Sequence, residues 1–253
     1  MKMKSKLSIL VAILCVFECR FAFSQSNRPE KAVTFRMLAW SKPVGGLLFE
    51  SEGKTQSVDV IVPNARTKAY SFTGAGDLVF FEVTTGPDGK ELRVPLLTVP
   101  YEQLGENILI LVLGYSPPYT AKVMDESNSG FPPGSYRFVN FTKLTIKVAL
   151  VAKDAEIETI APQSQGLVVP KKFKSGDVFT LRIVNETTEG GAKYHWIYSN
   201  RWMYGDRERI MAFINHDDSE LNDGFSVKCF TEDVPAPTQS RAQPSNTKPG
   251  RPQ

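Results

Sequence analysis

The sequence predicts an all-β protein of two tandem antiparallel β-sandwich modules, the second a duplicate of the first. Two observations lead to this fold class. Between Ala32 and Asp233, short runs rich in Val, Ile, Phe, Tyr and Thr recur about every 8–12 residues, with Gly, Pro, Asn and Asp between them. The order of these runs in the first half then recurs in the second half. Helical periodicity is almost absent, so strands with one face in a core are expected.

Eight strands are expected in the first half of the chain. Each is bounded by turn-forming residues, and Gly86-Pro87-Asp88-Gly89 has the composition of a hairpin loop. The expected strands cover residues 33–40, 46–50, 57–62, 68–72, 78–85, 91–99, 107–113 and 120–125.

The second half repeats this order. Tyr136-Arg137-Phe138 stands where Thr34-Phe35-Arg36 stands in the first half, and each opens a strand that leads to an aromatic residue, Phe141 or Trp40. The other matched segments are 55–63 with 155–162, 77–83 with 177–183, 86–89 with 189–191, 107–113 with 209–214 and 119–127 with 225–233. Because the order is kept throughout, we expect a duplicated module rather than the alternative, one continuous barrel.

Five segments are expected along the chain. They are a signal peptide at 1–24, a first module at 28–127, a linker at 128–134, a second module at 135–233 and a Pro-rich tail at 234–253. The linker is short and contains Pro132-Pro133, so the modules are expected to pack together. The tail has five prolines and too little apolar surface to fold, so it is expected to be disordered.

The N-terminus has the pattern of a secretory signal. Lys2, Lys4 and Lys6 precede a mainly apolar run at 7–17, and Ala22-Phe23-Ser24 fits the small-x-small cleavage pattern. The apolar run is about half the roughly 20 residues that a membrane-spanning helix needs. We therefore expect a periplasmic or secreted protein with no transmembrane helix after cleavage. The lipoprotein alternative is not favoured, because Cys15 and Cys19 do not follow small residues.

Charge and cysteine content argue against a nucleic-acid-binding protein and against a disulfide-bonded one. The formal charge is +3, and the signal peptide alone carries four bases and one acid, so the remainder is neutral. A nucleic-acid partner is not expected, because phosphate binding needs a clustered basic surface. Cys229 is the only cysteine after the signal, so no internal disulfide can form. Its alternation with Phe225 and Val227 predicts a buried core thiol.

No motif predicts catalysis, a metal ion or another cofactor. The two histidines, His195 and His216, lack metal-ligand spacing, and the acidic stretch around Asp217-Asp218 and Asp223 lacks the ligand order of a calcium loop. No Gly-x-Ser-x-Gly is present. Paired carboxylates of a glycosidase meet in space rather than in sequence, so a hydrolase stays an alternative.

The strongest candidate for binding is the aromatic segment 194–204. Strand alternation would place Tyr194, Trp196 and Tyr198 on one face, expected to lie in the core, and His195, Ile197 and Ser199 on the other. Trp202 and Tyr204 follow a polar break formed by Asn200 and Arg201, and all four are proposed as binding residues. Aromatic rings beside Arg and Asn bind sugars or peptides by stacking and hydrogen bonding. The alternative is that Trp202 fills the core while Tyr204 and Arg201 snorkel to the surface.

The second half also carries a resemblance to a known group. It has Gly-x-Tyr-Arg-Phe-x-Asn at 134–140, then Ile-x-Pro at 160–162, then a Trp-bearing hairpin that closes on Arg209-Ile210-Met211-Ala212-Phe213. Mainly over residues 131–233, this resembles exported tandem β-module proteins of Planctomycetes–Verrucomicrobia bacteria. The resemblance implies export and β architecture, and it supplies no site residues.

Three functions are consistent with these features. The first is an exported, non-enzymatic binding or scaffolding protein whose partner is a protein or polysaccharide of the cell envelope. It predicts an exposed apolar patch near Trp202 and Tyr204. The second is a glycan-active hydrolase with an acidic pair in a cleft between the modules. The third is an envelope assembly factor that uses an exposed edge strand.

Overall fold

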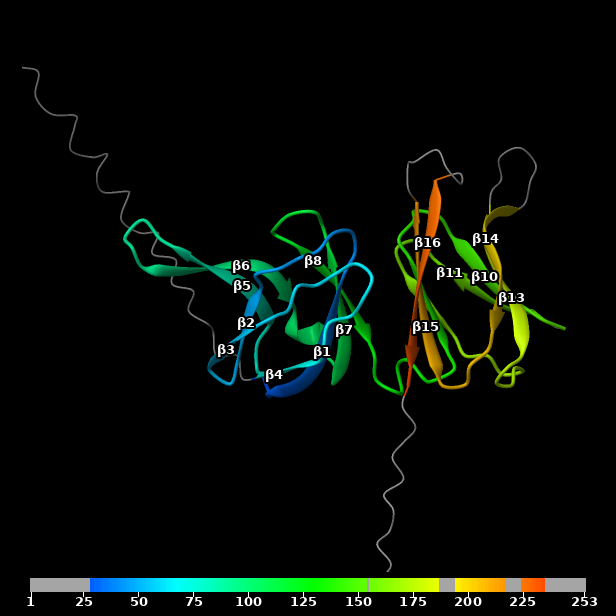
Figure 1. Ribbon diagram of the computed structural model, residues 1–253, viewed down its shortest axis with the longest axis horizontal. Helices are drawn as coiled ribbons and strands as arrows, with labels where there is room; N and C mark the ends of the chain where they lie inside the picture. Colours follow the sequence, from blue (N-terminus) through cyan, green and yellow to red (C-terminus); the bar gives the residue numbers. More distant parts are fainter. Residues whose placement is uncertain (1–27, 154, 187–193, 217–223, 235–253) are drawn as a thin grey trace, which may run out of the picture.

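The computed structural model describes residues 28–153, 155–186, 194–216 and 224–234 (Figure 1). Over these ranges the chain forms β-strands and one short 3-10 turn, Tyr101–Gln103. The predicted all-β fold class, with two tandem sandwich modules, is confirmed. No helix in the described ranges has the length and apolar content to cross a membrane.

The first module consists of two four-stranded sheets packed face to face. Their strand orders are β4-β1-β7-β8 and β3-β2-β5-β6. The strands are β1 (Lys31–Ala39), β2 (Leu48–Ser51), β3 (Lys54–Ser57), β4 (Tyr70–Gly74), β5 (Leu78–Thr85), β6 (Glu91–Val99), β7 (Asn107–Leu113) and β8 (Thr120–Asp125). A buried core lies between the sheets, where the Phe35 ring packs edge-to-face against Phe49 and Phe80.

The second module repeats the first strand by strand. Its sheets have the orders β12-β9-β15-β16 and β11-β10-β13-β14, which are the orders of the first module with eight added to every strand number. The strands are β9 (Tyr136–Asn140), β10 (Ile146–Val151), β11 (Ala155–Ile160), β12 (Gln165–Val168), β13 (Val178–Glu186), β14 (Tyr194–Met203), β15 (Glu208–His216) and β16 (Phe225–Asp233). Identical topology in both halves confirms the predicted duplication.

Each module also contains one parallel strand pair among antiparallel ones. β1 runs parallel to β7, and β9 runs parallel to β15. The hydrogen bonds that follow these pairs fix the equivalent residues: Trp40 N donates to Val112 O, and Phe141 N donates to Ile214 O. Trp40 and Phe141 therefore correspond, as the sequence predicts.

Counting back from this pair corrects the predicted alignment of the two first strands. Arg36 pairs with Leu109 in β7, and Arg137 pairs with Met211 in β15, so the two arginines are equivalent. The sequence alignment, which set Thr34 against Tyr136, is off by one residue. A slip of one residue would exchange the buried and exposed faces of a strand, so only the observed register keeps the cores intact.

The strand boundaries agree with the prediction to within two residues except near residue 60. β5, β6, β7 and β8 begin and end where the sequence predicts. The strand expected at 57–62 is instead β3, which ends at Ser57. The chain then leaves the sheet, and Ile61 forms an isolated bridge with Val44 in the core. Apolar residues there fill the core without extending the sheet.

A third apolar cluster joins the two modules. It lies between sheet β4-β1-β7-β8 and sheet β12-β9-β15-β16, so both middle sheets are covered on two faces. Its fully buried members are Leu38, Leu109, Leu111, Met124, Phe131, Val139, Met211 and Phe213. Phe131 comes from the connection between the modules and is fully buried. The predicted close packing of the modules is therefore present in the structure.

The contacts between the modules are reciprocal. Lys122 of β8 donates from Nζ to Gln163 O in the second module, and Lys228 of β16 donates from Nζ to Pro63 O in the first. The two lysines are equivalent, because Lys122 pairs with Leu111 and Lys228 pairs with Phe213. Each acceptor lies in or directly after an Ile-x-Pro turn. Such reciprocity is the mark of a twofold-related interface, here formed within one chain.

Several expectations fall outside the described residues. These are the signal peptide and its cleavage site, most of the C-terminal tail, the hairpin at 189–191 and the acidic stretch at 217–223.

Candidate functional site

Strand β14 carries the predicted aromatic segment, and a β-bulge changes which side chains face outward. The pairing with β13 shifts between Ile183 and Val184, so Ile197 has no direct partner. Ile197 and Tyr198 consequently both pack against the module core. Trp196 turns to the solvent side, where 57% of it is exposed. The expectation that Trp196 lies in the core is wrong, because simple alternation does not survive a bulge.

The four predicted binding residues divide into two pairs. Trp202 and Tyr204 are half-buried against the core, and Trp202 Nε1 donates to Tyr198 Oη over 3.1 Å. They lie next to the exposed patch rather than in it. Asn200 and Arg201 are exposed.

The exposed patch lies on the solvent side of sheet β11-β10-β13-β14, which we term the outer face. Its large apolar members are Ile157, Val178, Trp196 and Met203, with exposed fractions of 64%, 49%, 57% and 65%. The strand registers place them on one face. In β13 and β14, Val178 pairs with Met203 and Val184 pairs with Trp196. In β10, Ala149 pairs with Ile157 on one side and with Arg182 on the other. Val178 and Met203 form a pair near one end of β14, and Trp196 lies beside Arg182 near the other end. An indole ring exposed on a sheet face is typical of interaction surfaces.

Positive charge is interleaved with these apolar residues. Arg182 places its guanidinium carbon 5.3 Å from the centre of the Trp196 ring, a favourable cation–π distance. Arg201 and Lys147 occupy other positions of the outer face. Among its strand positions with described side chains, none is acidic.

The corresponding face of the first module differs. There Arg93 lies 4.9 Å from the centre of the Phe81 ring and forms an ion pair of 2.5 Å with Glu50. Phe81 is only 5% exposed, so the charges are paired and the aromatic ring is covered.

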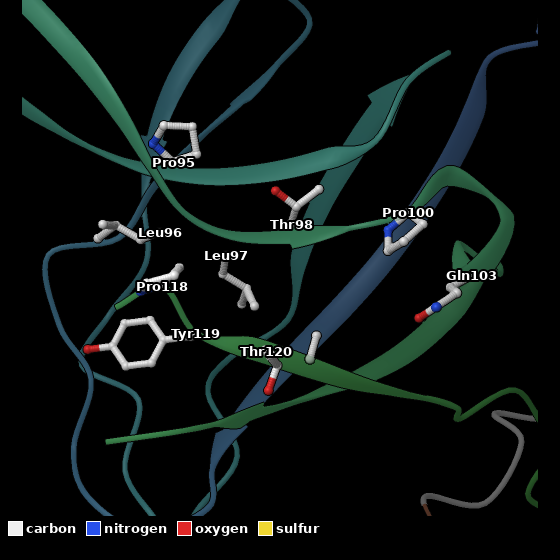
Figure 2. Close-up of a pocket in the computed structure, with 10 residues that line it drawn as sticks. Pro95, Leu96, Leu97, Thr98, Pro100, Gln103, Pro118, Tyr119 and Thr120 are labelled. Atoms are coloured by element: carbon white, nitrogen blue, oxygen red, sulfur yellow. The ribbon is translucent and has the colours of Figure 1, made fainter. Parts of the chain in front are cut away.

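Each module has a groove between the two edge strands on the same side of the sandwich. Groove 1 lies between β6 and β8 (Figure 2) and measures about 400 Å³. Groove 2 lies between β14 and β16 and measures about 570 Å³. The bulge aligns their linings residue by residue: Pro95, Leu96, Leu97, Thr98, Tyr119, Thr120 and Ala121 correspond to Trp196, Ile197, Tyr198, Ser199, Phe225, Ser226 and Val227.

The free edge of β6, beside groove 1, lacks backbone groups that a further strand would need for pairing. Pro95 and Pro100 offer no backbone N–H, and Tyr119 N donates to Leu96 O over 2.7 Å. The two missing N–H groups and the occupied carbonyl prevent the pairing of a further strand. In β14 the equivalent positions of the two prolines hold Trp196 and Arg201. Strand β14 spans 10 residues and contains no proline.

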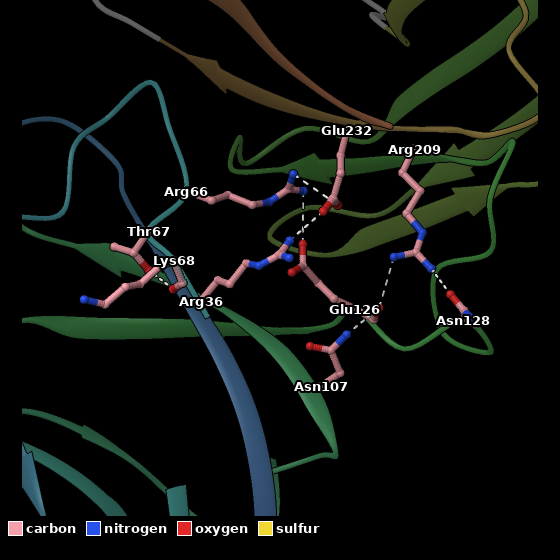
Figure 3. Close-up of polar contacts among 9 residues, drawn as sticks. All are labelled: Arg36, Arg66, Thr67, Lys68, Asn107, Glu126, Asn128, Arg209 and Glu232. Atoms are coloured by element: carbon pink, nitrogen blue, oxygen red, sulfur yellow. Dashed lines mark hydrogen bonds and ion pairs between the residues drawn. The ribbon is translucent and has the colours of Figure 1, made fainter. Parts of the chain in front are cut away.

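A polar cluster lies at the interface of the modules (Figure 3). Arg66 of the first module binds Glu126 Oε1 at 3.0 Å and Glu232 Oε2 at 3.3 Å, and Arg36 binds Glu232 Oε1 at 2.5 Å. Burial raises the pKa of Glu126 above its ordinary value, while Arg66 opposes this shift. Arg209 adds hydrogen bonds to Glu126 O and to Asn128.

Glu126 and Glu232 form the acidic pair that a hydrolase between the modules would need, but they are not arranged for substrate. The guanidinium of Arg66 bridges the two carboxylates, and only 3% of the Glu126 side chain is exposed. A glycosidase requires both carboxyl groups to reach the scissile bond. The adjacent cavity of about 520 Å³ is lined by Arg36, Arg66 and Glu232. Arg66 therefore neutralises both carboxylates, and the ion pairs of Glu232 with Arg36 and Arg66 join the modules.

The remaining candidates from the sequence are a metal site, His216 and Cys229. No group of three or more His, Cys, Asp or Glu side chains that could hold a metal ion occurs in the described part of the chain. His216 is exposed and lies edge-to-face with Phe225, 5.0 Å between ring centres. Cys229 is exposed, so the predicted core thiol is wrong: beyond Val227 this face of β16 no longer covers the core. Its sulphur is nevertheless desolvated enough to raise its pKa to about 11.

The outer face as a whole was not found from sequence. Ile157, Val178 and Met203 come from three strands, and each looks like an ordinary half-buried strand residue by itself. One difference between the two copies could have indicated this face. Pro95 and Pro100 of the first copy are replaced by Trp196 and Arg201 in the second, and this replacement is recognised only when the bulge gives the correct alignment. No protein-family model matches this chain, and neither does any curated protein.

Proposed function

We propose that the protein is an exported, non-enzymatic binding protein whose second module attaches to a protein or polysaccharide of the cell envelope through the outer face. The observation that carries the proposal is Trp196, which is 57% exposed and has the Arg182 guanidinium carbon 5.3 Å from its ring centre. An indole left in water beside a cation is a usual binding hot spot, since it offers a large apolar area with little conformational freedom to lose.

The two modules have different roles in this proposal. The first module covers its outer aromatic residue with the Arg93–Glu50 pair, and it packs against the second through a buried apolar interface. It would therefore hold the second module rigidly and offer little binding surface itself. The signal-like N-terminus supports a role outside the cytoplasm.

Capture of envelope material on the immobilised full-length protein tests this function. We expect Trp196→Ala to lower the amount captured by about tenfold, as for a hot-spot residue. Leu92→Ala is the matched control, because Leu92 is similarly exposed, at 52%, on the first module. Equal capture by the wild type and Trp196→Ala would refute the assignment of the outer face.

A further inference from the structure

We infer that the partner of the second module is an extended polypeptide segment in which acidic and apolar residues alternate, and that it binds by adding a strand to the free edge of β14. This inference rests on the proposed function and names the class of its ligand. The supporting observations are the edge of β14 that no other described strand pairs with, groove 2 on one side of that edge and the cationic outer face on the other.

In the described part of the chain, no strand pairs with the second edge of β14. Tyr204 N donates to Asp177 O, so Tyr204 lies on the side that pairs with β13. Arg201 N instead donates to the side chain of Asn200, over 2.8 Å. Because backbone groups of alternate residues point to opposite sides of a strand, Ser199, Arg201 and Met203 present theirs to the free edge. A partner carbonyl would replace the Asn200 side chain at the Arg201 amide.

The duplicated unit provides an internal comparison. In the first module β6 contains Pro95, Pro100 follows the strand directly, and Tyr119 N is already bonded to Leu96 O. Natural edge strands carry proline where pairing must be prevented. At the equivalent positions β14 carries Trp196 and Arg201, residues that keep their N–H groups. The difference between two copies of one unit indicates that pairing is blocked in the first and permitted in the second.

The side chains on either side of the edge define the ligand. A strand added to β14 would direct alternate side chains to the outer face and to groove 2. The outer face offers Arg182 and Arg201, and none of its strand positions with described side chains is acidic, which favours glutamate or aspartate. The exposed surface of groove 2 is mainly polar, and Ile197 and Val227 supply its apolar part, which favours small apolar residues at the positions that contact them.

Two other occupants fit less well. The tail of this chain carries Arg241, Lys248 and Arg251 and no acid, so its charge has the same sign as the outer face. A second copy paired through β14 would bring the cationic outer faces of both copies together, which is unfavourable in a sheet.

Titration of a synthetic peptide tests the inference. The probe is a fluorescent peptide of about eight residues in which glutamate and valine alternate, a length suited to one strand. Its binding to the full-length protein is measured by fluorescence anisotropy. Arg201→Pro, which restores the residue of the first module, should weaken binding at least about tenfold, and Arg201→Ala, which keeps the amide, about threefold. Pro100→Ala in the first module is the control and should leave binding unchanged.

Two changes to the ligand keep the test decisive if Arg201→Pro fails to fold. N-methylation of alternate peptide bonds on the pairing side should abolish binding, because it removes the strand hydrogen bonds. Replacement of glutamate by lysine should weaken binding at least about tenfold through repulsion from Arg182 and Arg201. Equal binding of the methylated peptide would overturn strand addition, and equal binding of the lysine peptide would overturn the acidic character of the ligand.

The outcomes separate this inference from the proposed function. If the peptide does not bind the wild type while Trp196→Ala still lowers capture of envelope material, the ligand is of another class, such as a polysaccharide, and only this inference is wrong. If Trp196→Ala changes neither capture nor peptide binding while Arg201→Pro abolishes the latter, the edge is the site and the outer face is not.

Discussion

Trp40 of the first module packs against Phe141 of the second, with ring centres 4.8 Å apart and ring planes tilted by 49°. The two residues occupy the same position in the duplicated unit, directly after β1 and β9. Phe213 completes the contact, 5.6 Å from Trp40. The modules therefore share a core built from equivalent residues of both copies.

Replacement of Phe213 by alanine should destabilise the whole protein. Phe213 is 1% exposed and belongs to the core between the modules. Removing such a ring from a packed core costs about 3–5 kcal/mol. Urea denaturation followed by tryptophan fluorescence measures the loss, with the exposed Leu92→Ala as a control that should stay within about 0.5 kcal/mol. A loss below about 1 kcal/mol would show that the modules do not share a core.

The buried carboxyl of Glu126 predicts a defined dependence on pH. Burial raises its pKa above the ordinary 4.5, so the folded protein holds this proton more tightly than the unfolded chain. The stabilisation from this group is complete below pH 4.5 and is lost as the pH rises through the folded-state pKa. The stability of Glu126→Gln relative to the wild type should therefore increase as the pH rises from this region.

Urea denaturation of both proteins across a pH series measures this difference. A relative stability that instead moves in favour of the wild type at higher pH would mean that the ion pair with Arg66 outweighs burial.

Gly134 is required by both its backbone and its surroundings. Its φ is +75°, and a Cβ atom there would lie 2.5 Å from Tyr204 Oη. Gly134→Ala should cost about 2–4 kcal/mol, against about 1 kcal/mol for Gly46→Ala, where φ is also positive but no atom is near. Thermal unfolding compares the two variants. Adding Tyr204→Phe should recover part of the loss, and no recovery would argue against the contact.

Cys229 should react slowly despite its exposure. Its pKa of about 11 leaves little thiolate at pH 8, whereas an ordinary cysteine has a pKa of about 8.5. With Cys15 and Cys19 replaced by serine, the rate of alkylation by iodoacetamide should be about a hundredfold below that of a free thiol. A rate equal to that of free cysteine would show that the sulphur is not desolvated.

The sequence predicted the fold well, because runs of alternating apolar and polar residues, separated by turn-forming residues, are typical of sandwich strands. Four strands, β5 to β8, have the predicted limits, and the duplication is present in full. Errors occurred where tertiary context overrides a local pattern. Ile61 is apolar and extended but joins the core outside the sheet. Trp196 lies one residue from a bulge, which reverses the direction of its side chain.

The candidate site was located only in part. The aromatic segment drew attention to β14, and Asn200 and Arg201 are indeed exposed there. Trp202 and Tyr204 pack against the core instead. The rest of the site depends on Ile157 and Val178, which other strands bring to the same face through long-range pairing. Long-range register cannot be read from one strand at a time.

Hydrogen exchange on the complex tests the central claim most directly. NMR of the full-length protein, with and without the alternating glutamate–valine peptide, follows the amides of Ser199, Arg201 and Met203. We predict that saturation with the peptide slows their exchange by at least about tenfold, because each would lie within a new strand pair. Thr98, at the equivalent edge of β6, should not change. Protection of Thr98, or no protection along β14 when the peptide is bound, would contradict the claim.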